Sequence, residues 1–132
     1  MDKAIQNEIE AYLRKAEERL EVAKLLNEHA AFEDAVSRAY YAMHHGAQAA
    51  LLTEGIRAKT HRGLGMLFGF HLVKQGKLPE KLAKYLKNIR DDREESDYDV
   101  GSHIDKETCQ IAIREAEEFV QEIKIFLKRF GI

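Results

Sequence analysis

FEDAVSRAYYAMHHGAQAALL, residues 32–52, is the stretch that decides the fold. Apolar side chains recur in it three and four residues apart, which is typical of the buried face of an α-helix. They are Phe32, Ala35, Val36, Ala39, Tyr40, Met43, Ala47, Ala50 and Leu51. A second stripe of polar and ring-bearing side chains holds Ser37, Tyr41, His44 and Gln48, with Arg38 and His45 beside it. The stretch therefore predicts one helix with a core face and a face suited to function.

The rest of the chain shows the same helical periodicity and no alternation of the kind that strands show. The other expected helices cover residues 3–29, residues 64–74, a segment from Pro79 to near Asp97, and a last segment to about Phe130. Short connections between helices favour antiparallel neighbours. The sequence therefore predicts an all-α protein, an up-and-down helical bundle of four to five helices in a single domain over residues 1–132.

Local signals mark the ends of these helices. Asp2 is an expected N-cap, Gly55 an expected C-cap, and Ser102 or Asp105 an expected cap of the last helix. Residues 53–63 form the expected loop, which is the most basic local stretch and contains Arg57, Lys59, His61 and Arg62. A solvated connector and a phosphate-contacting loop both fit this composition.

Composition limits the classes of function. The 132 residues carry a net charge of −2, so a nucleic-acid contact must come from a local patch rather than from bulk attraction. A single cysteine, Cys109, allows no internal disulfide and fits a reducing cytoplasm. No apolar run is long enough to cross a bilayer, and the N-terminus does not resemble a signal peptide. We expect a cytoplasmic protein without membrane contact and with Cys109 in the core.

The chain lacks the standard enzyme motifs for nucleotide phosphates, hydrolytic serine and catalytic zinc. Adjacent His44 and His45 project about 100° apart on a helix, and the other histidines are scattered, so we expect no metal and no cofactor. Metal-free RNA cleavage needs a base for the ribose 2′-OH and a cation for the phosphate. Arg38 could supply the cation, and His44 or His45 could supply the base. Alternatively, Arg38 is an ion-pair partner and the two histidines are ordinary surface or interface residues.

Several segments together resemble a known family. They are Ser37-Arg38-Ala39-Tyr40-Tyr41-Ala42-Met43-His44-His45, then Glu54-Gly55 and His61, then Arg93-Glu94-Glu95-Ser96-Asp97-Tyr98. In this order and spacing they are similar to the HEPN domain, and to small stand-alone HEPN proteins with SRxYYAxxH and RxxxDY segments. The likeness covers nearly the whole chain.

The resemblance implies a helical bundle that forms a homodimer. Many HEPN proteins are metal-independent ribonucleases, whereas others bind nucleotides or act as the toxin of a two-gene pair with a small nucleotidyltransferase. The ribonucleases carry an arginine, a short gap and a histidine in a late helix. Beyond that gap from Arg93 stand Tyr98, Asp99 and Val100, so the usual motif is not intact. Arg38 and His44 are separated by a short gap of the kind found in this motif, but they lie in an earlier expected helix.

We therefore expect a HEPN-type protein that binds RNA or nucleotide, the HEPN half of a toxin–antitoxin-type module with a small nucleotidyltransferase. The alternatives are an active metal-independent endoribonuclease and a non-catalytic dimeric interaction module. The expected catalytic residues are Arg93, Tyr98 and His44. The expected ligand-binding residues are Arg38, Tyr41, His45, His61 and Asp97.

Overall fold

The computed structural model describes residues 1–98, 100 and 103–132, and for residues 96–98 it describes only the backbone. The helices are α1 (Lys3–Glu28), α2 (Phe32–Leu52), α3 (His61–Phe68), the π-helical turn η1 (Gly69–Val73), α4 (Glu80–Tyr98), α5 (Lys106–Leu127) and the 3₁₀ turn η2 (Lys128–Phe130). None of the described residues lies in a strand. The predicted all-α bundle is confirmed.

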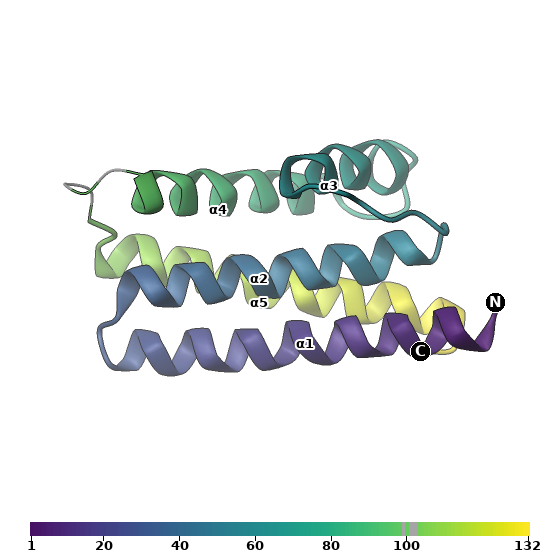
Figure 1. The fold of residues 1–132 in the computed structure, drawn as a ribbon, viewed down its shortest axis with the longest axis horizontal. Helices are drawn as coiled ribbons and strands as arrows, with labels where there is room; N and C mark the ends of the chain where they lie inside the picture. The colour runs from purple at the N-terminus through teal and green to yellow at the C-terminus, as the bar shows by residue number, and fades with distance from the viewer. Residues whose placement is uncertain (99, 101–102) are drawn as a thin grey trace.

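Helix α2 runs through the middle of the bundle, with α1 along one side and α3 and α4 along the other (Figure 1). Most of its residues are buried, and many of them are alanine. These small side chains let neighbouring helices approach closely. A Cβ atom built at Gly46 would lie 3.4 Å from Cε1 of Phe119, so α5 packs almost directly on the α2 backbone. The stretch that predicted the fold is thus its central element.

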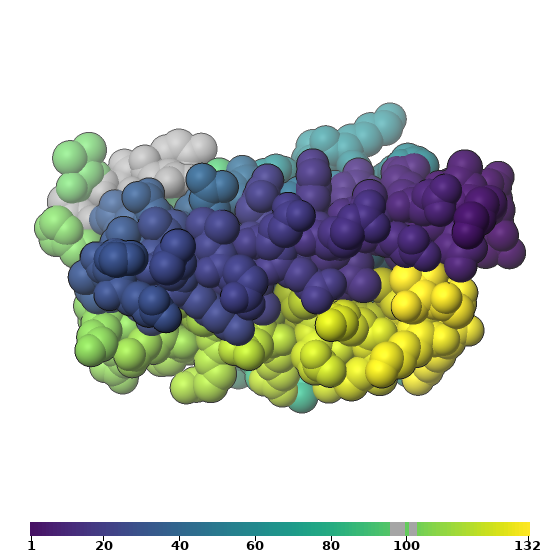
Figure 2. Space-filling model, turned by 90° about the horizontal axis from the view of Figure 1, so that it is seen from below, coloured from purple at the N-terminus to yellow at the C-terminus, as the bar shows by residue number. Residues whose placement is uncertain are grey.

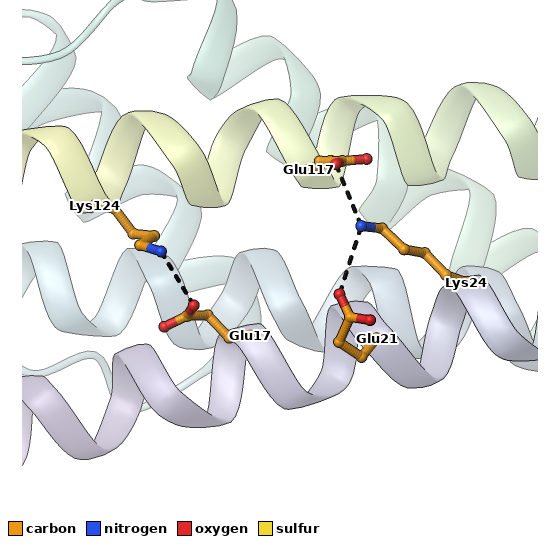
Figure 3. Close-up of polar contacts among 5 residues, drawn as sticks. All are labelled: Glu17, Glu21, Lys24, Glu117 and Lys124. Carbon is orange, nitrogen blue, oxygen red and sulfur yellow. Dashed lines mark hydrogen bonds and ion pairs between the residues drawn. The ribbon is translucent and has the colours of Figure 1, made fainter.

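Helices α1 and α5 lie side by side along one face of the molecule (Figure 2). Ion pairs join them: Lys24 Nζ lies 3.2 Å from Glu117 Oε1, and Lys124 Nζ lies 3.2 Å from Glu17 Oε2 (Figure 3). Lys24 also lies 3.5 Å from Glu21 of its own helix. Such surface pairs contribute at most about 1 kcal/mol each, so their main consequence is to neutralise the charges on this side of α1.

The predicted helix ends are largely confirmed. The Asp2 carboxylate accepts a hydrogen bond from the Ala4 amide (2.7 Å), and the Asp105 carboxylate accepts one from the Thr108 amide (2.8 Å). Asp105 is therefore the N-cap of the last helix, and Ser102, the other expected cap, lies outside the described residues. Gly55 ends the turn after α2 with a φ of +70°, a left-handed conformation that glycine adopts without a steric cost.

One boundary differs from the prediction. Helix α3 begins at His61, whereas the sequence analysis placed residues 53–63 in a loop. The Thr60 hydroxyl caps the helix by accepting a hydrogen bond from the Gly63 amide (2.9 Å). A Cβ atom at Gly65 would lie 3.2 Å from Nη1 of Arg90, so the glycine that suggested a break instead admits a side chain from α4. The cap outweighs the low helix propensity of the two glycines.

The core is continuous across the bundle and includes Cys109, which is fully buried as predicted. Burial raises the pKa of its thiol, which makes the thiolate scarce at neutral pH. Among the described helices, none combines the length and apolarity that a bilayer crossing requires.

Candidate functional site

Five rings gather where α2 meets α3, and we call them the ring cluster: Tyr40, Tyr41, His44, His45 and His61. The ring centroids of His44 and His61 are 4.5 Å apart, and those of Tyr40 and Tyr41 are 5.2 Å apart in an edge-to-face arrangement. Helix α2 supplies four of the rings because residues 40, 41, 44 and 45 fall on one side of its surface. Helix α3 supplies His61 from its first position.

Arg93 of α4 reaches into this cluster. Its Nη2 donates a hydrogen bond to the Tyr41 hydroxyl (3.3 Å). Its guanidinium carbon lies 4.8 Å from the ring centroid of Tyr40 and 5.3 Å from that of Tyr41, within the range of cation–π attraction. Two tyrosines from the early helix therefore hold an arginine from the late helix, as the sequence analysis anticipated for Tyr41 and Arg93.

His61 is the exposed member of the cluster. Its Nδ1 lies 2.7 Å from the Tyr40 hydroxyl. A hydroxyl donates to a neutral imidazole and accepts from a protonated one, so Tyr40 orients the ring in both charge states. This leaves Nε2 for other partners. Burial, and then the Arg93 charge, lower the pKa of His61 below 6.5, so the ring is mostly neutral at pH 7.

His44 lies beneath this surface with 7% of its area exposed. Burial, with smaller effects from His61, His45 and Arg93, lowers its pKa to about 4. Its Nδ1 has no hydrogen-bond partner among the described residues. Burial also raises the pKa of Tyr40 to about 12, with Arg93 opposing that change. Both rings are thus uncharged supports at neutral pH.

His45 points toward α1 instead of toward Arg93. Its Nδ1 lies 2.8 Å from Oε1 of Gln48, and its ring stacks on that of Tyr12 with centroids 6.0 Å apart. The pKa of His45 is lowered mainly by burial, and also by the positive charges of Lys15 and Arg19, although the Gln48 contact opposes the change. His45 therefore marks a place where α1 brings cations close to the ring cluster.

Arg38 is exposed and lies one helical turn before Tyr41. Together they line an open hollow of about 410 Å³ with Leu26, Asp34 and Ser37. Among the described residues, Arg38 forms no hydrogen bond or ion pair with the ring cluster. Tyr41 thus belongs both to the Arg93 contact and to the hollow that holds Arg38.

Two predicted residues, Asp97 and Tyr98, lie outside the described side chains, although the α4 backbone reaches them. The sequence analysis did not name Tyr12, and it assigned Tyr40 to the apolar stripe of residues 32–52. In the structure, Tyr12 stacks on His45 next to the ring cluster, and the Tyr40 hydroxyl is hydrogen-bonded to His61. A tyrosine in an apolar stripe is the sequence signal that could have indicated these contacts, because a buried tyrosine hydroxyl needs a hydrogen-bond partner.

No group of three or more His, Cys, Asp or Glu side chains within the described part of the chain could hold a metal ion. The ring cluster itself brings together an arginine, a mostly neutral exposed imidazole and aromatic rings.

The chain is similar to one described protein family and to several named proteins. The family model described as HEPN domain matches residues 9–126. A Methanocaldococcus jannaschii protein named "Putative toxin MJ0605" is 39% identical over 97% of this chain and 95% of its own length. UPF0332 protein PH1297 of Pyrococcus horikoshii is 32% identical over 95% of this chain and 87% of its own. A second M. jannaschii protein, "Putative toxin MJ0142", is 31% identical over 96% of this chain and 86% of its own.

Proposed function

Because the chain belongs to the HEPN domain family, we propose that it is a toxin-type HEPN protein that binds RNA or nucleotide at Arg93 and the ring cluster. Relatives named as toxins support the toxin assignment. In this proposal the chain works as a homodimer and pairs with a small nucleotidyltransferase as its antitoxin.

The observation that carries the proposal is the Arg93 guanidinium lying against Tyr40 and Tyr41 and bonded to the Tyr41 hydroxyl. Arginine carries five N–H donors in a fixed fork that fits phosphate oxygens, and it remains charged at any physiological pH. Of the two rings beside it, that of Tyr41 is half-buried and offers an open face for a base, whereas Tyr40 is buried. A nucleotide carries both a phosphate for Arg93 and a base for Tyr41.

A second candidate function, metal-independent RNA cleavage, draws support from His61. Its ring is exposed, held through Nδ1 and mostly neutral, so Nε2 is free to take a proton from a ribose 2′-OH. Arg93 would stabilise the extra negative charge on the phosphate. The buried position of His44 favours His61 as the proton acceptor, with His44 beneath it.

Binding and cleavage are measured on one set of purified proteins. We expect the wild-type chain to bind uridine monophosphate and single-stranded RNA, and Arg93→Ala to weaken that binding about tenfold or more, because a charge-assisted hydrogen bond contributes about 1.5–3 kcal/mol. Arg114→Ala, which removes an exposed arginine of α5, is the matched control and should bind normally. Absence of binding at millimolar ligand, with the protein folded, contradicts the proposal and leaves the non-catalytic interaction module.

The same proteins incubated with RNA and a chelator decide the second candidate. Cleavage that is lost in His61→Ala, while RNA binding persists, supports a ribonuclease. No cleavage by the wild-type chain at any concentration removes that function and leaves binding alone. The partner is tested by inspecting the adjacent gene for a small nucleotidyltransferase and mixing that protein with the chain. Absence of such a gene, or failure to form a complex, would contradict the pairing.

A further inference from the structure

The seam between α1 and α2 carries features that the Arg93 site does not use. The two helices run antiparallel, so the end of α1 lies beside the start of α2 (Figure 1). Leu26 and Asp34 share one hollow, and Tyr12 meets His45 and Gln48 farther along. The seam therefore extends along both helices past the ring cluster.

A row of rings joins two hollows on this seam. The centroids of Tyr41 and His45 are 6.2 Å apart with ring planes inclined by 33°, and those of His45 and Tyr12 are 6.0 Å apart with planes inclined by 24°. One hollow, of about 410 Å³, lies beside Tyr41 and Arg38. The other, of about 150 Å³, lies between Tyr12 and Leu52. All three rings are half-buried, so each keeps some of its surface open.

Cations follow the same row. Lys15 and Arg19 lie three and seven residues after Tyr12, which places them on the same stripe of α1. Burial is the main cause of the lowered pKa of His45, and the charges of Lys15 and Arg19 lower that pKa further. Arg38 stands at the first hollow. Within the described part of the chain, none of these three cations forms an ion pair, whereas Arg57 at the far end is bound by Glu8 (2.8 Å).

On the opposite side of α1, which faces α5, the lysines are held in ion pairs. Lys15 and Lys24 are separated by about two and a half helical turns, so they project to opposite sides of the helix. Lys24 is held by Glu21 and Glu117, and Lys124 is held by Glu17 (Figure 3). Acidic partners thus neutralise Lys24 and Lys124 on the α5 side, whereas Lys15, Arg19 and Arg38 along the seam have no ion-pair partner among the described residues. These three cations form a local basic row of the kind that a chain of net charge −2 needs in order to hold nucleic acid.

Unpaired cations alternating with open aromatic faces are what an unstacked nucleic-acid strand requires. Phosphates follow the cations, and each base stacked on an aromatic ring contributes about 1–3 kcal/mol. The paired bases of a duplex hide their faces, so they cannot use the rings. We propose that the α1–α2 seam is a track for single-stranded RNA, which holds the nucleotides that flank the one at Arg93. This inference rests on the proposed function, and it makes an RNA strand of several nucleotides the ligand of that site.

The test compares uridine monophosphate with a uridine octanucleotide. We expect the octamer to bind more tightly than the monophosphate. In Lys15→Ala/Arg19→Ala, octamer affinity should fall about tenfold while monophosphate affinity is unchanged, and the slope of log K against log salt should fall by about 1.4, near 0.7 for each lost contact. The matched control, Lys24→Ala/Lys124→Ala, removes the same charge from the α5 side and should bind the octamer normally.

A second pair of variants tests stacking. Tyr12→Leu should weaken octamer binding at least about fivefold, because it removes one stacking face. Tyr12→Phe keeps the ring and should bind like the wild type. Neither substitution should alter monophosphate binding at Arg93.

The outcomes separate the two proposals. If the monophosphate binds but the octamer binds no tighter, or if the seam and control variants behave alike, the track is overturned and the Arg93 site stands. If neither ligand binds, both proposals fall. If Lys15→Ala/Arg19→Ala changes the sedimentation coefficient from dimer to monomer and leaves octamer affinity unchanged, the seam is an interface between two copies of the chain and the RNA track is overturned.

Discussion

At the scale of single residues, Arg93 and His61 act on each other through charge. The guanidinium disfavours a second positive charge nearby, so it helps to keep the imidazole neutral. Removing the guanidinium in Arg93→Ala should therefore raise the pKa of His61, and NMR titration of the ring measures that change. Arg114→Ala should leave it unchanged. A pKa that falls, or stays constant, in Arg93→Ala would show that the two side chains are not close in solution.

His44 should make the fold sensitive to acid. The unfolded chain binds a proton there near pH 6.5, whereas the folded chain binds it only near pH 4. The folded state therefore loses stability as the pH falls through this window, by about 2 kcal/mol between pH 7 and pH 5 from this residue. Urea unfolding at both pH values should show a smaller loss in His44→Gln than in the wild type. Equal losses would mean that His44 is protonated in the folded chain.

The residues that sequence reasoning found are those whose chemistry departs from their surroundings. Tyr41 and His45 lie on or beside a polar stripe of the expected helix, and Arg93 is surrounded in sequence by acidic residues. These departures led to their prediction as site residues. Tyr12 and Tyr40 were not predicted as site residues, because a tyrosine at core spacing satisfies the periodicity of a buried face. Their second role depends on partners in other helices, and no spacing within one helix encodes those partners.

At the scale of elements, the start of α3 positions the exposed histidine. Thr60 caps this helix through the Gly63 amide, and His61 is its first residue. Thr60→Ala should cost about 1 kcal/mol of unfolding free energy and should speed hydrogen exchange at the Gly63 amide, because the cap is lost. Thr60→Ser keeps the hydroxyl and serves as the control. If both variants exchange at the wild-type rate, the hydroxyl does not hold the helix start.

The start of α3 was placed too late in the sequence analysis because the prediction did not use the Thr60 cap. Gly63 was placed in the predicted loop and Gly65 in the predicted helix over residues 64–74, whereas the Thr60 cap starts the helix at His61 in the folded chain. The cap was visible in the sequence as a threonine three residues before Gly63, but the contact with α4 was not. Helices with strong periodicity and no internal glycine pairs, such as α1 and α5, were predicted to within a few residues.

At the scale of the whole molecule, the packing of α2 on α5 decides how the bundle closes. Gly46→Leu would drive a side chain into Phe119 and Ile123, so it should cost about 1–3 kcal/mol. Gly46→Ala adds only a methyl group at ordinary contact distance and removes the glycine entropy cost, so it should be neutral or stabilising by up to about 1 kcal/mol. Thermal unfolding of both variants measures this. Equal behaviour of the two variants would argue against the close α2–α5 approach.

Helical periodicity predicted the bundle. Motifs that resemble those of HEPN proteins over most of the chain predicted the family, which the HEPN match confirms. The homodimer, the nucleotidyltransferase partner and the ligand remain proposals. They depend on surfaces such as the α1–α2 seam, where residues from distant parts of the chain meet only after folding.

The six histidines provide the most direct test of the central claim, which is that Arg93, Tyr41 and His61 form a ligand site. Ring resonances of ¹⁵N-histidine-labelled protein are followed while a single-stranded uridine octanucleotide is added. We predict that His61 and His45 shift with increasing RNA, whereas His29, His71 and His103 do not. Saturating RNA that leaves His61 and His45 unmoved, or shifts only the other three, would contradict the account.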